Sequence, residues 1–258
     1  MKNHWIVFTL VFSLIAFSLE AFAAHPLITD DAGTVGKGHF QMELNSSATF
    51  DEETEDGKGV KESEVELETV FTYGLTDEID LVATLPYAWS WEKEDGVTSD
   101  ENGIADASLE MKWRFFEADD FSLAVKPGIS LPTGDKGKGL GTGEVGYSAF
   151  FIASQAMDPW AFHLNLGYMR NENDFDERRD LWHVSLATEW NVAERLTLVG
   201  NVGAEANPDR ADDTPPVFAL AGFIYSVAEH VDVNAGFKAG LTRPEADFAV
   251  LTGVTFTF

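Results

Sequence analysis

The strongest constraint on the fold is a strict two-residue alternation of apolar and polar side chains. In EVELETVFTYG, residues 64–74, side chains at every second position are mainly apolar, and glutamates occupy most positions between them. Successive side chains of a strand point to opposite faces, so a strand here has one apolar and one charged face. A helix would scatter the same glutamates around its cylinder. The pattern therefore predicts a β-strand with water on one side only.

Twelve segments show this alternation. They lie near residues 38–50, 64–74, 79–90, 103–116, 121–131, 143–155, 160–170, 180–190, 195–205, 217–227, 231–241 and 246–258. Each is about as long as the 9–11 residues that a tilted membrane strand requires. In the fourth segment, the row facing away from water is Leu109, Met111, Trp113 and Phe115. The set predicts an all-β fold, an up-and-down antiparallel barrel that spans a membrane.

The connections between the segments alternate in length. Short turns lie at 75–78, 117–120, 156–159, 191–194 and 228–230, and longer charged linkers at 51–63, 91–102, 132–143, 171–180 and 206–216, with a short sixth at 242–245. Aromatic residues gather at strand ends, as expected of rings at a membrane–water boundary. Short turns on one rim and long loops on the other are typical of bacterial outer-membrane barrels.

The N-terminus is typical of a secretory signal peptide. A short start with Lys2 precedes an apolar run at residues 5–19, and small residues end at Ala23. We expect cleavage after Ala23, so that residues 1–23 form the signal peptide and residues 24–258 a single barrel domain. An uncleaved anchor is the alternative, but the run is shorter than the roughly 20 residues of a spanning helix.

Composition excludes several classes of function. Asp and Glu outnumber Lys and Arg by 44 to 17, which argues against a nucleic-acid partner. The chain has no cysteine, so disulfides, thiolate metal sites and cysteine nucleophiles are excluded. Acidic runs in the linkers lack EF-hand spacing, and GTGEVG at 141–146 is followed by a strand instead of the helix that a nucleotide site needs. We expect neither a metal site nor a cofactor.

The last strand, FAVLTGVTFTF at residues 248–258, places apolar side chains mainly at alternate positions and ends in phenylalanine. Phe256 and Phe258 share the face that would meet lipid. Such an ending resembles the signal by which outer-membrane barrels are recognised for insertion. The resemblance implies that outer-membrane lipid and the barrel-assembly machinery are partners of this strand.

Further stretches resemble a family of outer-membrane transporters named for the meta pathway of phenol degradation. They are HPLITDDAGTVGKGHFQMEL (25–44), GLTDEIDL (74–81), LPY (85–87), GIADASLEMKWR (103–114) and PGISLPTGDKGKGLGTGE (127–144). The resemblance implies a barrel with a transport role in the outer membrane of a Gram-negative bacterium. It carries no catalytic motif, and it does not identify the solute.

Ionisable side chains fall on the face opposite the apolar rows. They are Glu66, Glu68, Asp80, Asp106, Glu110, Lys112, Arg114, Lys126, His163, His183, Glu189, Asn201, Glu205, Asp232 and Lys238, with Asn201 the one member that does not ionise. Each Lys or Arg placed in mid-membrane lipid would cost roughly 2–4 kcal/mol, so these groups must face water or one another. They either line an aqueous path or pair into a plug, and a twelve-stranded lumen allows both.

Loop 132–143 is a candidate constriction. If it folds inward, Asp135, Lys136 and Lys138 would carry charge into the pore; otherwise it is a flexible external loop.

Three functions remain open at this point. The leading hypothesis is a porin-like channel for passive transport of an unknown small-molecule solute, hydrophobic or aromatic solutes included. A closed barrel that acts through its acidic external loops is the alternative. A barrel hydrolase using His163 with Ser185, or His183 with Glu189, is the third, although no G-x-S-x-G motif is present.

Overall fold

The computed structural model describes residues 25–55, 58–94, 97–173, 175 and 177–258. The expected signal peptide, residues 1–23, lies outside these. The described residues form thirteen strands: β1 (Phe40–Glu55), β2 (Lys58–Gly74), β3 (Ile79–Glu94), β4 (Val97–Ile104), β5 (Ala107–Ala118), β6 (Phe121–Leu131), β7 (Gly146–Met157), β8 (Trp160–Arg170), β9 (Asp180–Ala193), β10 (Leu196–Glu205), β11 (Val217–Ala228), β12 (Val231–Gly240) and β13 (Phe248–Thr257). A single 3-10 turn, η1 (Lys136–Lys138), is the helical element of this part of the chain. No described helix is long and apolar enough to cross a membrane.

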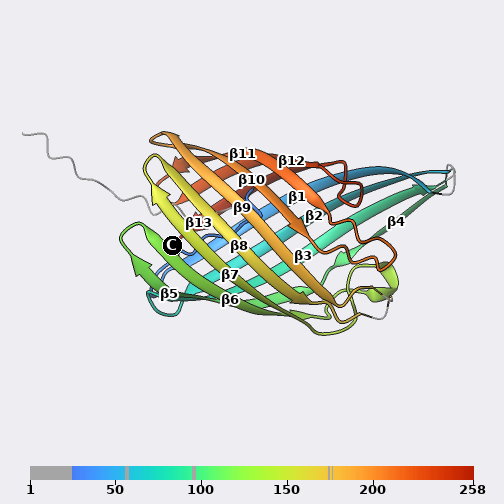
Figure 1. Ribbon diagram of the computed structural model, residues 1–258, viewed down its shortest axis with the longest axis horizontal. Coiled ribbons are helices and arrows are strands. Elements are labelled where there is room, and N and C mark those ends of the chain that lie inside the picture. The colour runs from blue at the N-terminus through green and yellow to red at the C-terminus, as the bar shows by residue number, and fades with distance from the viewer. Residues whose placement is uncertain (1–24, 56–57, 95–96, 174, 176) are drawn as a thin grey trace, which may run out of the picture.

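The strands close into one antiparallel barrel (Figure 1). Strands that are neighbours in the chain pair with each other, apart from β4 and β5, and β13 pairs with β1 to complete the ring. β5 and β4 lie end to end along β3, where they pair with residues 79–84 and 87–94 respectively. They therefore share one strand position of the barrel, so thirteen strands fill twelve positions. The predicted twelve-stranded barrel is confirmed.

The C-terminal strand closes the barrel edge. The backbone N–H of Phe258 donates to the carbonyl of Phe40 at 2.8 Å, and the N–H of Phe40 donates back at 3.2 Å. Closure leaves no long unpaired edge inside the membrane zone, where a free backbone group would cost several kcal/mol.

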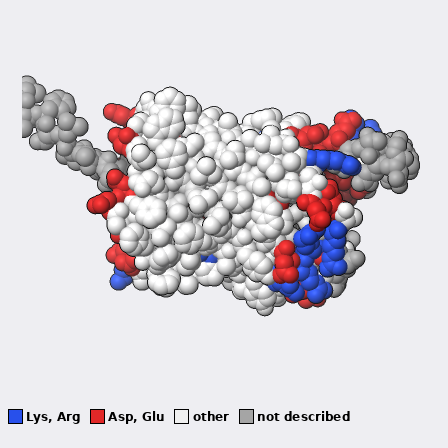
Figure 2. Space-filling view, in the orientation of Figure 1, with Lys and Arg blue, Asp and Glu red and all other residues white. Residues whose placement is uncertain are grey.

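The outer wall is apolar. Leu109, Met111, Trp113 and Phe115 are 37–48% exposed, so the predicted outward row is confirmed. On the face shown in Figure 2, charged residues gather at the two ends of the molecule, and the belt between them is almost free of charge. Outward rings mark the edges of that belt: Trp160 and Trp190 stack at 5.0 Å near the short turns, and Tyr168 and Trp182 pair across strands toward the other end.

Two of the predicted linkers are instead strands. Residues 51–55 and 58–63 extend the β1–β2 hairpin, and residues 91–94 and 97–102 extend the β3–β4 hairpin. Both extensions project past the closed barrel (Figure 1). Beyond the membrane both faces of a strand meet water. Charged residues therefore replace the alternation there, although the hydrogen-bond ladder continues.

The direction of the side chains yields a test. Leu166→Lys in β8 places an ammonium group on the outer wall, and we expect it to lower the free energy of unfolding by about 2–4 kcal/mol. Ser47→Lys in β1, which faces the lumen, should have a much smaller effect. Urea unfolding in lipid vesicles measures both; equal losses would contradict the assigned faces.

Candidate functional site: a lumen crossed by the N-terminal segment

The N-terminal segment, residues 25–39, precedes the first strand and enters the barrel. On one side it binds the inner faces of β12 and β10. His25 Nδ1 lies 2.7 Å from Asn234 Oδ1. The N–H of Thr29 donates to Asn201 Oδ1 at 3.0 Å, and Asn201 Nδ2 donates to Thr29 Oγ1 at 2.7 Å. The side-chain amides of the wall thus replace the strand partners that this segment lacks.

Further along, the segment binds the opposite wall. The N–H of Ala32 donates to Ser154 Oγ of β7 at 2.9 Å, and the N–H of Val35 donates to Asp80 Oδ2 of β3 at 3.0 Å. Because β12, β10, β7 and β3 lie at different points of the ring, the segment crosses the lumen.

The chain then reverses at the short-turn rim to enter β1. Gly36 and Gly38 have φ of 82° and 81°, which side chains rarely allow. The N–H of Gly38 donates to the carbonyl of Gly74 at 2.8 Å. A Cβ at Gly74 would overlap the Gly36 carbonyl, so these glycines permit the close approach.

Asp30 attaches the segment to two lysines. Its Oδ1 lies 2.8 Å from Lys112 Nζ of β5, and its Oδ2 lies 2.8 Å from Lys126 Nζ of β6. Lys126 also lies 3.6 Å from Glu110, and Asn165 donates to the Asp30 carbonyl. All three charged groups of the Asp30 clamp (Asp30, Lys112 and Lys126) are largely buried. Each therefore needs its oppositely charged partner to offset the cost of removing its charge from water.

The clamp persists across neutral pH. Burial alone would raise the pKa of Asp30, but the ammonium groups of Lys112 and Lys126 outweigh burial and hold this pKa well below its usual range. A carboxyl with a lowered folded pKa stabilises the fold above its unfolded pKa of about 3.9. That contribution is lost only as the pH falls from there through the folded pKa.

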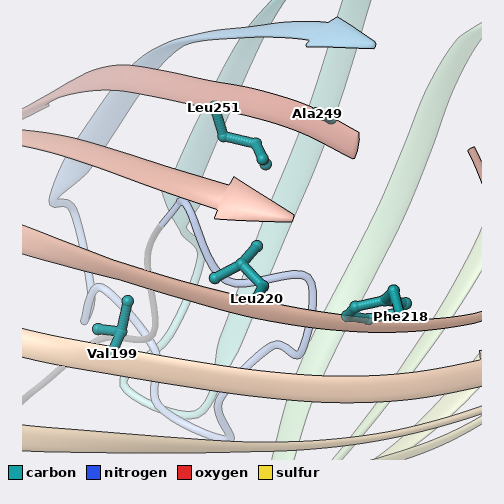
Figure 3. Close-up of a cluster of buried hydrophobic side chains, with 5 residues drawn as sticks. All are labelled: Val199, Phe218, Leu220, Ala249 and Leu251. Carbon is teal, nitrogen blue, oxygen red and sulfur yellow. The ribbon is translucent and has the colours of Figure 1, made fainter. Parts of the chain in front are cut away.

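Apolar side chains fix the segment as well. Leu27 packs on a cluster of inward side chains from β10, β11 and β13. The cluster comprises Val199, Phe218, Leu220, Ala249 and Leu251 (Figure 3). Ala32 packs against Ala124 and Ile152 on the other side, and all three are fully buried.

A cavity of about 600 Å³ remains beside the segment. Its wall comes mainly from the inner faces of β1, β2 and β3, with two residues each from β5 and β13 and one each from β6 and β12. Its acidic lining residues are Asp30, Asp31, Glu43, Glu66, Glu68, Asp80 and Glu110, and its basic ones are Lys112, Lys126 and Lys238. Leu27, Ala249 and Leu251 add an apolar side.

The lysines of the cavity are already engaged. Lys112 and Lys126 belong to the Asp30 clamp, and Lys238 Nζ lies 2.7 Å from Glu245. Among the described residues, no ion pair reaches Glu66 or Glu68. The cavity therefore has an excess of negative charge on its β2 side.

Seven of the residues that the sequence placed in the lumen line this cavity: Glu66, Glu68, Asp80, Glu110, Lys112, Lys126 and Lys238. Arg114 lies instead near the short-turn rim, where its Nη2 donates to the carbonyl of Asp77 at 3.0 Å.

The two histidines lie on the inner wall away from the cavity. His163 Nδ1 is 2.9 Å from Ser154 Oγ, and its Nε2 is 3.5 Å from Glu189. Ser154 already receives the N–H of Ala32, so this group supports the N-terminal segment. His183 Nε2 lies 2.9 Å from Ser185 Oγ.

Asp106 organises the loop at 132–143. It lies at the break between β4 and β5 and accepts the N–H groups of Gly134 at 2.9 Å and Thr142 at 2.8 Å. Asp135 accepts the N–H of Gly137 and begins η1, while Lys138 lies 3.3 Å from Glu101 of β4. The loop that carries Asp135, Lys136 and Lys138 is thus held against β4 and the β4–β5 break, and none of these three residues lines the cavity.

Closed strands, an apolar belt and a charged lumen define a transmembrane β-barrel of the outer-membrane type. The chain belongs to the family described as "Putative MetA-pathway of phenol degradation", whose model matches residues 23–258. The family match thus confirms the resemblance found in the sequence. No curated protein matches the chain.

Solved structures share the fold at low identity. An outer-membrane channel from Pseudomonas putida F1 has a TM-score of 0.68 at 14% identity, covering 88% of this chain and 98% of that one. The translocator domain of the autotransporter NalP from Neisseria meningitidis has 0.56 at 11%, covering 86% and 89%. The KdgM porin has 0.56 at 6%, covering 84% and 99%. These similar proteins are an outer-membrane channel, a translocator domain and a porin.

The N-terminal segment was not foreseen from the sequence. It has no alternation and no regular structure, and Asp30 meets Lys112 from 82 residues away. The one available signal was a carboxylate ahead of the first strand together with the inward lysines Lys112 and Lys126.

Removing the charge of Asp30 tests the clamp. Asp30→Asn leaves two lysines without their shared carboxylate, and we expect the segment to lose on the order of 3 kcal/mol of local stability. Hydrogen exchange should become faster at the amides of residues 28–35. Asp120→Asn in an exposed turn is the matched control, and unchanged protection in Asp30→Asn would contradict the role of the clamp.

Asp106→Ala tests the loop. The loss of its hydrogen bonds to Gly134 and Thr142 should cost the loop at least about 3 kcal/mol. Trypsin should then cleave after Lys136 or Lys138 faster than in the native protein. Glu144→Gln is the control, and equal cleavage rates in native protein and Asp106→Ala would show that Asp106 does not hold the loop.

Proposed function

We propose that this protein is an outer-membrane channel for passive diffusion of small molecules. The observation that carries the proposal is a cavity of about 600 Å³ with charged and apolar sides, which remains in the lumen beside the N-terminal segment. Pockets of this volume suit small organic molecules. Solutes would pass between the segment and the wall formed by β1, β2 and β3.

The inward charges would set the selectivity. Glu66 and Glu68 attract cations into the cavity, while the engaged lysines contribute little net positive charge. The loop with Asp135, Lys136 and Lys138 borders the outer mouth and would restrict entry there. No reaction is assigned to the histidines, since His163 shares Ser154 with the N-terminal segment.

The proposal includes the route to the membrane. Residues 1–23 serve as a cleaved signal peptide, and residues 24–258 form one barrel domain. The barrel-assembly machinery would recognise the last strand through Phe256 and Phe258, and outer-membrane lipid would cover the belt. The family description refers to phenol degradation, which supports small aromatic molecules among the solutes.

Planar-bilayer recordings test the channel. The folded protein should give discrete conductance steps. Under a salt gradient, the sign of the reversal potential should show that cations pass more readily than anions. Glu66→Gln/Glu68→Gln should lower the ratio of cation to anion permeability.

The control for that variant is Glu194→Gln/Glu229→Gln, which removes the same charge from two exposed turns. A correctly folded barrel that conducts nothing would contradict the channel. It would instead favour a closed barrel that acts through the projecting β1–β2 and β3–β4 hairpins.

A further inference from the structure

The carboxylates on the inner face of β2 form a row. Glu64, Glu66 and Glu68 occupy alternate positions, so neighbouring members are about 7 Å apart along the strand. No ion pair reaches any of the three among the described residues. Glu66 and Glu68 line the cavity, which thus presents two carboxylates with no counter-charge from the protein.

A second feature of the same wall is an unsatisfied amide. Asn45 is only 6% exposed and lines the cavity, and its Oδ1 has no hydrogen-bond partner. Asn45 lies directly opposite Glu68 in the β1–β2 register. A buried carbonyl oxygen without a partner is costly, so the protein alone leaves the polar groups of this wall incompletely satisfied.

An apolar surface lies within reach of the row. Glu66 pairs with Ser47 of β1, and Ser47 pairs with Leu251 of β13. Two strand spacings separate Glu66 from Leu251, which is about 10 Å. Leu251 and Ala249 line the cavity, and Leu27 of the N-terminal segment lies against them.

We infer that the cavity is a binding site for small organic cations in which an ammonium group is joined to an apolar body. The ammonium group lies between Glu66 and Glu68, and the apolar body lies on Leu251, Ala249 and Leu27. A metal ion is a poorer fit, because no group of three His, Asp or Glu side chains among the described residues is arranged to hold one. This inference deepens the proposed channel by naming its class of solute, and in that sense rests on it.

Calorimetric titration of the detergent-solubilised protein tests the site without requiring conduction. Benzylamine, benzyl alcohol and benzoate share one ring and differ in charge. We expect benzylamine to bind at least about tenfold more tightly than the other two. Equal affinity for benzylamine and benzyl alcohol would overturn the inference.

Two variants locate the site. Glu66→Gln/Glu68→Gln should abolish the preference for benzylamine, whereas the control Glu194→Gln/Glu229→Gln should keep it. Leu251→Ala should weaken benzylamine more than methylamine, because methylamine has no ring to contact the apolar side. A preference for benzylamine that survives Glu66→Gln/Glu68→Gln would overturn the inference. A change of migration on heating in gel electrophoresis, as in the native barrel, shows that the variant is folded.

The result separates the two proposals. Binding of benzylamine in a barrel that conducts no ions would support the site and reject the channel. Conductance in a barrel with no preference for benzylamine would support the channel and reject the site.

Discussion

The fold depends on the separation of charge from lipid. Every strand of the wall turns one row of side chains to the membrane and one to the lumen. Ionised groups are compatible with a stable fold only in the lumen row, because charge in lipid is destabilising. Lys112 and Lys126 illustrate what this arrangement demands. Both are largely buried inside the barrel, and a single carboxylate, Asp30, lies 2.8 Å from each of them. The charge balance of the lumen therefore depends on a residue outside the barrel wall.

That dependence makes the lumen asymmetric. The N-terminal segment covers the apolar inner faces of β10 and β11 with Leu27 and reaches the lysines of β5 and β6 with Asp30. The inner faces of β1 and β2 remain uncovered, and there Glu66 and Glu68 line the cavity without a basic partner among the described residues. One side of the lumen is therefore closed by the chain itself, and the other retains space with negative charge.

The alternation of apolar and polar residues predicted the features that depend on neighbouring residues alone. The outward row of Leu109 and Met111 follows from two-residue alternation. The number of strand positions in the barrel and the closing strand at the C-terminus follow from it as well. The extension of β1 and β2 beyond the membrane could not be predicted this way, because charged residues on both faces suit a loop or a strand in water. The course of residues 25–39 could not be predicted either. It is set by long-range contacts, such as Thr29 with Asn201, that no sequence period encodes.

The central claim is that the N-terminal segment lies inside the barrel. The chain contains no cysteine, so Thr29→Cys gives a single reporter at a position that is 1% exposed. A bulky, membrane-impermeant maleimide applied to the protein in lipid vesicles measures its access. The account predicts that the thiol stays unlabelled in the folded barrel and is labelled fully once the barrel is unfolded in urea. Rapid labelling in the folded protein would contradict the account.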